Sequence, residues 1–160
     1  PCGYYNHPTK ECVCAPGAVQ RYLNRVSGPL LDRIDLHIEV TPVPFEEMTA
    51  KRNTEKSTAI QARVIQAREV QQTRFKDHEG IYTNAMMTSS MVKAHCGISQ
   101  LGQNLLKVAM ERLGLSARAY DRILKVSRTI ADLAGSKNIR EEHIAEAIQY
   151  RSLDRRSWGT

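Results

Sequence analysis

From Phe45 onward, apolar residues recur at intervals of three and four positions, which is the spacing of one face of an α-helix. The periodicity predicts helices at 55–76, near 89–95, and at 99–113, 116–134 and 140–150. In the fourth of these, the apolar stripe consists of Ala119, Ile123, Val126 and Ile130. The fold class is therefore expected to be mainly α, with residues 51–160 forming a self-contained helical bundle.

Residues with helix-capping chemistry stand at several of the expected helix ends. Ser116 is expected to cap the N-terminus of the fourth helix. Gly114 and Gly135 stand where helix-ending glycines belong. Asn138 is expected to cap the last helix, with Glu141 three residues later in the capping-box position.

A period of two occurs once, in the first third of the chain. Residues 34–40 alternate between apolar and charged or polar side chains, which predicts a strand that follows a short helix over the run GAVQRYLNRV. Nothing else in the chain reads as its partner, and a lone strand is not stable by itself. We therefore expect the rest of the sheet to lie upstream of Pro1, so that residues 1–50 are the end of an incomplete α/β domain.

The charge of the chain is unevenly distributed. Residues 1–50 hold 4 Lys and Arg against 6 Asp and Glu, a net of −2, and residues 51–160 hold 19 against 11, a net of +8. Such a basic excess favours polyanionic partners, including nucleic acid, although a solvated helical surface explains it equally well. No apolar run reaches the roughly 18 residues of a membrane span and no secretory leader is visible, so we expect a cytoplasmic protein.

Three of the four cysteines lie close together in the sequence. Cys2, Cys12 and Cys14 stand within a turn-rich segment, and His7 between them could supply a fourth ligand to zinc. The alternative is three ordinary reduced thiols in a loop. Cys96 stands alone and is expected to be a buried structural thiol.

Two arginines have surroundings that suit phosphate chemistry. Arg33 lies between Asp32 and Asp35, which fits either a structural salt bridge or a cation presented to the phosphate of a neighbouring subunit. Arg118 lies in the first turn of a predicted helix, where the helix dipole disfavours a cation. It fits either a solvated surface residue or a cation that meets a phosphate at that helix end.

The remaining basic residues of that helix are expected to face solvent; they are Arg122, Lys125 and Arg128. The chain contains no G-x-x-x-x-G-K-[ST] phosphate loop, and no H-E-x-x-H, G-x-S-x-G or G-x-G-x-x-G motif. Taken alone, the chain is therefore not expected to be a competent enzyme.

Four runs, in this order, resemble the magnesium-chelatase-like AAA+ ATPases of the ComM/YifB group. They are CGYYNHPTKECVC, VQRYLNRVSGPLLDRIDLHIEV, LSARAYDRILKVSRTIADL and HIAEAIQYRSLDR. The resemblance implies a ring-forming, hexameric bacterial ATPase that uses ATP and Mg, with its phosphate loop upstream of Pro1. Residues 1–50 would then be the C-terminal end of the AAA+ core, and residues 51–160 the C-terminal helical lid.

The resemblance also implies roles for single residues. Arg33 in LLDRIDL matches the arginine finger, which reaches the ATP site of the next subunit, and Arg118 in LSAR matches the second-sensor arginine, which meets the γ-phosphate of its own subunit. Cys2, Cys12 and Cys14 match a cysteine cluster whose usual start is C-P-C-G-Y, so the first cysteine of a zinc site would stand immediately before Pro1.

ComM-like proteins resemble DNA motors, and the resemblance implies DNA remodelling such as branch migration. Two alternatives stay open from the sequence. One is a chelatase-type or chaperone-type motor that acts on a protein partner, and the other is a zinc-containing interaction module.

Overall fold

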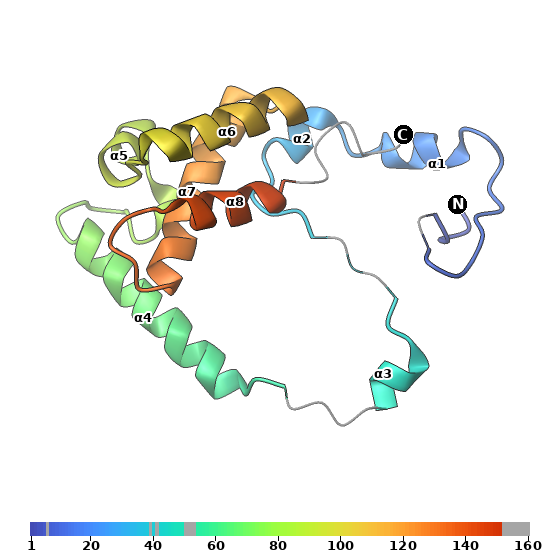
Figure 1. Ribbon diagram of the computed structural model, residues 1–160, viewed down its shortest axis with the longest axis horizontal. Coiled ribbons are helices and arrows are strands. Elements are labelled where there is room, and N and C mark those ends of the chain that lie inside the picture. The colour runs from blue at the N-terminus through green and yellow to red at the C-terminus, as the bar shows by residue number, and fades with distance from the viewer. Residues whose placement is uncertain (6, 39, 41, 50–53, 152–160) are drawn as a thin grey trace.

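The computed structural model describes residues 1–5, 7–38, 40, 42–49 and 54–151, and within these it contains helices and no strand, which confirms the mainly α fold class. The boundary expected between residues 50 and 51 lies outside the described residues. In chain order the elements are α1 (Ala18–Leu23), α2 (Gly28–Leu31), α3 (Phe45–Thr49), α4 (Ser57–Phe75), the 3-10 helix η1 (Asn84–Met86), α5 (Ser89–His95), α6 (Gln100–Leu113), α7 (Ala117–Leu133) and α8 (Glu141–Gln149). Figure 1 shows α4 to α8 gathered in one bundle, with α1 and α3 apart from it.

Helix α7 is the centre of the bundle, because it packs against α4, η1, α5 and α8. Its predicted stripe faces the core: Ala119 and Ile123 are fully buried, and Val126 and Ile130 pack against the core from its edge. Each large apolar side chain removed from water in this way stabilises the fold by roughly 1.5–3 kcal/mol. The other buried members of the core are Phe75, Met87, Met91, Val92, Cys96, Leu106, Leu124, Ala131, Ile139, Ile144 and Ala147.

Three of the helix ends are where local chemistry places them. The hydroxyl of Ser116 accepts a hydrogen bond from the backbone N–H of Ala119 at 3.3 Å, as the N-cap prediction requires. Gly114 ends α6 with φ 62°, and Gly135 follows α7 with φ 64°, a left-handed conformation that glycine adopts without steric cost.

The predicted cap of the last helix is wrong. The N-cap of α8 is Arg140, two residues after Asn138, and the backbone N–H of Arg140 donates to Nδ1 of His143 at 3.0 Å. The physical reason is the burial of Ile139, which is 5% exposed in the core. At Ile139 the backbone is non-helical while the side chain is buried in the core. The helix therefore begins only after Arg140.

The segment predicted as a strand forms no strand in the described part of the chain. A ladder needs a partner, and residues 34–38 instead run beside the end of α8, where the backbone N–H of His37 donates to the carbonyl of Tyr150 at 2.7 Å. The apolar face of the alternation is exposed, at 41% for Ile34 and 66% for Ile38. Within the described residues the alternation therefore has no partner strand, and a sheet upstream of Pro1 stays a prediction.

None of the described helices is long and apolar enough to span a membrane.

Candidate functional site

Arg33 lies on the surface two residues after α2, and its Nη1 donates to the carbonyl of Pro29 at 2.7 Å. Asp35, one of the two acids that flank Arg33 in the sequence, pairs with Arg122 of α7 and not with Arg33. The hydrogen bond to Pro29 fixes one side of the guanidinium and leaves the exposed remainder able to meet a partner.

The segment that carries Arg33 is fastened to the C-terminal end of α8. Arg151 is 1% exposed, and its Nη1 donates to the carbonyl of Ile34. His37 adds its backbone bond to Tyr150, and its ring Nε2 lies 3.3 Å from the carbonyl oxygen of Leu31. Sequence reasoning missed Arg151, since a lone arginine after a helix carries no sign of burial.

Arg118 is the second residue of α7 and is exposed. Within the described part of the chain, no hydrogen bond or ion pair engages its guanidinium. The first turn of α7 holds no acidic residue, so this cation stands against the positive end of the helix dipole, and the carboxylate of Asp121, three residues further on, accepts from Ser89 instead. An anion at this helix end would be attracted both by the backbone N–H groups and by Arg118.

The expectation that the other basic residues of α7 face solvent is wrong for Arg128, which is 4% exposed. Its Nε donates to the Asp132 carboxylate at 3.1 Å, and its Nη atoms donate to the carbonyls of Ser136 and Lys137. The reason is the central place of α7, whose polar side is covered by the following loop as well as by neighbouring helices. Arg122 and Lys125 remain partly accessible.

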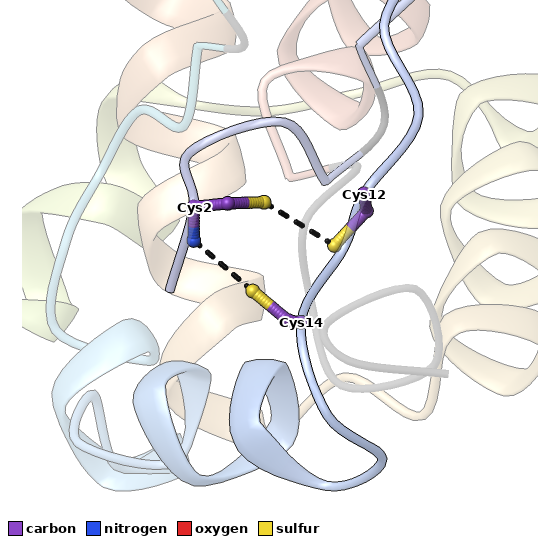
Figure 2. A group of neighbouring side chains, drawn as sticks. All are labelled: Cys2, Cys12 and Cys14. Carbon is purple, nitrogen blue, oxygen red and sulfur yellow. Dashed lines mark hydrogen bonds between the residues drawn. The ribbon is translucent and has the colours of Figure 1, made fainter.

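The three N-terminal cysteines come together, as Figure 2 shows, from a turn-rich loop packed near α1. Their Sγ atoms all lie within 4.8 Å of one another, with Cys2 Sγ 3.6 Å from Cys12 Sγ and the Cys2 N–H 3.0 Å from Cys14 Sγ. Sulfurs bound to one zinc at about 2.3 Å lie roughly 3.8 Å apart, so a small contraction would fit the three thiols to that ion.

The proposed fourth ligand lies outside this group. His7 is not among the residues whose ligand atoms converge, and its Nδ1 accepts from the backbone N–H groups of Thr9 and Lys10 at 3.2 and 3.1 Å. In the described part of the chain the donor set is therefore three sulfurs, which leaves one position of a tetrahedral zinc site to another ligand.

The thiols differ in acidity. The hydrogen bond from the Tyr4 N–H, followed by smaller bonds from Val13, Cys14 and Cys12, lowers the pKa of Cys2 to about 7. Although the Cys14 N–H acts in the opposite direction, the neighbouring thiols and partial burial raise the pKa of Cys12. Cys2 thus ionises more readily than Cys12, and the thiolate is the form that binds metals.

Cys96 is buried, as its isolation in the sequence predicted, and burial raises the pKa of its thiol to about 11. Cys96 is a structural side chain and does not belong to the N-terminal cysteine cluster.

Two family models match the chain. The model described as "Magnesium chelatase, subunit ChlI" matches residues 1–48, and "Magnesium chelatase, subunit ChlI C-terminal" matches residues 54–151. The chain belongs to the magnesium chelatase family. This confirms the resemblance drawn from the four sequence runs.

Relatives within the magnesium chelatase family match almost the whole chain. Competence protein ComM of Haemophilus influenzae is 41% identical over 157 residues, which are 97% of this chain and 29% of that protein. YifB of Escherichia coli (strain K12) is 40% identical over the same shares, and protein Mb2921c of Mycobacterium bovis is 32% identical over 98% of this chain and 31% of its own length. The chain thus spans less than a third of these relatives.

Proposed function

We propose that this chain is the C-terminal part of a ring-forming AAA+ ATPase of the magnesium chelatase family, working in the cytoplasm, that couples ATP hydrolysis to DNA remodelling such as branch migration. In this proposal the ATP-binding core, with its phosphate loop and Mg-binding residues, belongs to a longer protein that includes this chain. The chain contributes Arg118 and Arg33, and the ring is a homo-oligomer of six subunits.

The observation that carries the proposal is the state of Arg118. It is an exposed cation in the first turn of a long helix, a turn that holds no acidic residue, and an anion there would be stabilised by both the guanidinium and the helix end. A γ-phosphate bound by the same subunit is an anion of this kind. Arg118 would then act as the second sensor, drawing the helical lid toward bound ATP.

Arg33 suits the complementary role in the neighbouring site. Its guanidinium is exposed and held by one backbone carbonyl, on a segment fixed to the bundle by Arg151. A planar cation delivered by an adjacent subunit stabilises the charge that develops as the phosphoryl group leaves, and such arginine fingers raise rates by about 10³–10⁵ in other systems. The bond that is hydrolysed belongs to ATP bound with Mg. This chain would supply two cations: Arg118 to the ATP site of its own subunit, and Arg33 to the ATP site of the next subunit.

Two observations support DNA as the partner. Residues 51–160 carry the basic excess of the chain, which favours a polyanion, and the relative from Haemophilus influenzae is named a competence protein. A motor acting on a protein partner would share the ATPase parts and would differ in what stimulates them.

The test is ATP hydrolysis by the full-length protein, without DNA, with single-stranded DNA and with branched DNA. We expect Mg-dependent hydrolysis that DNA stimulates, and no turnover by the 160-residue chain alone. Hydrolysis indifferent to both DNAs would contradict the DNA motor and favour a protein partner. Turnover by the isolated chain would contradict the division of the ATP site between this chain and an upstream core.

A further inference from the structure

This inference rests on the proposed function. We propose that Arg122 is a positioning residue, and that its ion pair with Asp35 holds the segment of residues 33–37, the Arg33 segment, on α7, the helix that carries Arg118. The two arginines would then move as one unit. An anion bound by Arg118 in one ATP site would thereby set the position of Arg33 in the next.

Each partner of the ion pair is close in sequence to one of the two arginines. Asp35 is two residues after Arg33, and Arg122 is four residues, about one helical turn, after Arg118. The Nη1 atom of Arg122 donates to Oδ1 of Asp35 across 87 residues of sequence. One side-chain contact therefore joins the two segments.

The second attachment of the segment is at α8. The carbonyl of Ile34 accepts from buried Arg151, and the N–H of His37 donates to the carbonyl of Tyr150 at 2.7 Å. With Asp35 bound to α7 between these two points, the segment is held on both helices. Because α7 and α8 pack against each other in the core, the attachments act on one rigid support.

Apolar packing does not replace these polar contacts. A groove of about 310 Å³ lies beside the segment, and its walls include Leu36 on one side and Val126 and Ile130 of α7 on the other. The apolar side chains of the segment are largely exposed, at 46% for Leu36. Because little apolar packing holds the segment in place, loss of the ion pair should increase its mobility. The loss of a single contact inside a well-packed core would have a smaller effect.

The first test measures amide hydrogen exchange in the 160-residue chain, which needs no ATPase activity. In Asp35→Arg and in Arg122→Asp, we expect the His37 amide to exchange about two- to fivefold faster, the range that an exposed ion pair can supply. The double variant, which reverses the pair, should restore the parent rate. Unchanged exchange in both single variants would overturn the inference.

The second test measures kcat and KM for ATP in the full-length protein. Each single variant should lower kcat by about two- to tenfold with KM for ATP nearly constant, and the reversed pair should recover kcat. Asp35→Asn and Arg122→Gln give the same test without adding a like charge. The matched control is Glu55→Gln, which removes an exposed ion pair with Arg63 at 2.7 Å and should leave kcat unchanged.

The result separates this inference from the function on which it rests. If Arg33→Ala abolishes hydrolysis and Arg118→Ala weakens it while the Asp35 and Arg122 variants keep the parent kcat, the coupling is wrong and the ATPase assignment stands. If Arg33→Ala and Arg118→Ala hydrolyse ATP normally, the assignment fails, and the coupling between the two arginines fails with it.

Discussion

Arg74 and Asp132 form a two-point ion pair that joins α4 to α7, 58 residues apart in the sequence. Nη1 of Arg74 lies 2.7 Å from Oδ2 of Asp132, and Nη2 lies 2.6 Å from Oδ1. The same carboxylate accepts from Arg128 and from the side-chain amide of Asn84 at 2.8 Å. A single buried carboxylate thus organises the polar side of α7, and it forms ion pairs with two guanidinium groups.

We predict that Asp132→Ala lowers the free energy of unfolding by about 3–5 kcal/mol, because it leaves the buried Arg128 guanidinium and the partly buried Arg74 guanidinium without a counter-charge. Urea unfolding of the chain, followed by circular dichroism, measures this change. Glu55→Ala is the control, since the Glu55–Arg63 pair is about half exposed on both sides and should contribute less than about 1 kcal/mol. Equal losses in the two variants would contradict a structural role for Asp132.

The helices of the bundle were predictable because their signals are local. The period of apolar residues placed α7 within one residue of each end, and Ser116 caps it as its hydroxyl chemistry requires. The cap of α8 was not predictable, because it depends on the burial of Ile139 in a core built from other helices.

The buried charges were not predictable, because their partners are distant in sequence. Arg128 on a helix surface looks like a solvated residue until its neighbours are known, and only its spacing of four residues from Asp132 hinted at a pair. Residues 34–38 show the same limit. Their alternation specifies a face, whereas a strand also needs a partner that the local sequence does not supply.

For the candidate sites, the sequence identified residues and the structure added their surroundings. Cys2, Cys12 and Cys14 converge as their spacing suggested, while His7 does not join them. Arg33 and Arg118 are exposed, and their roles remain predictions for the assays below.

We predict that Arg33→Ala in the full-length protein abolishes ATP hydrolysis and leaves ATP binding nearly unchanged, because the finger acts in the site of the next subunit. Hydrolysis rates and nucleotide titration measure the two properties. Mixing this variant with subunits whose phosphate loop is inactivated should restore part of the activity, since such subunits can still donate Arg33. An Arg33→Ala protein that hydrolyses ATP at the parent rate would contradict the finger.

We predict that Arg118→Ala weakens turnover through the site of its own subunit. The same mixing experiment distinguishes it from Arg33: subunits with an inactive phosphate loop should not rescue Arg118→Ala, because the defect and the intact phosphate loop lie in the same site. Arg112→Ala, an exposed arginine at the end of α6, is the control and should leave turnover unchanged. Unchanged kinetics in Arg118→Ala would count against the sensor role.

We predict that the chain binds zinc through Cys2, Cys12 and Cys14, at about one ion per chain, and that replacing any one of them by serine weakens binding by at least tenfold. Metal content after dialysis, and competition with a chromogenic chelator, measure this. Cys96→Ser is the control, because that thiol is buried and stands outside the cluster. A zinc content well below one ion per chain in the parent would contradict the site.

Burial, together with the charges of Arg74, His78 and Arg128, lowers the pKa of His95 below its ordinary value of 6.5. As the pH falls through 6.5, the unfolded chain therefore takes up a proton at this position before the folded chain does, and stability is lost. We predict that His95→Gln flattens the fall in the urea midpoint between pH 7 and pH 5. Lys93→Gln, an exposed change on the same helix, should leave the slope as in the parent. A His95→Gln slope equal to that of the parent would mean that His95 titrates alike in both states, and that its position against Phe75 does not disfavour the charged ring.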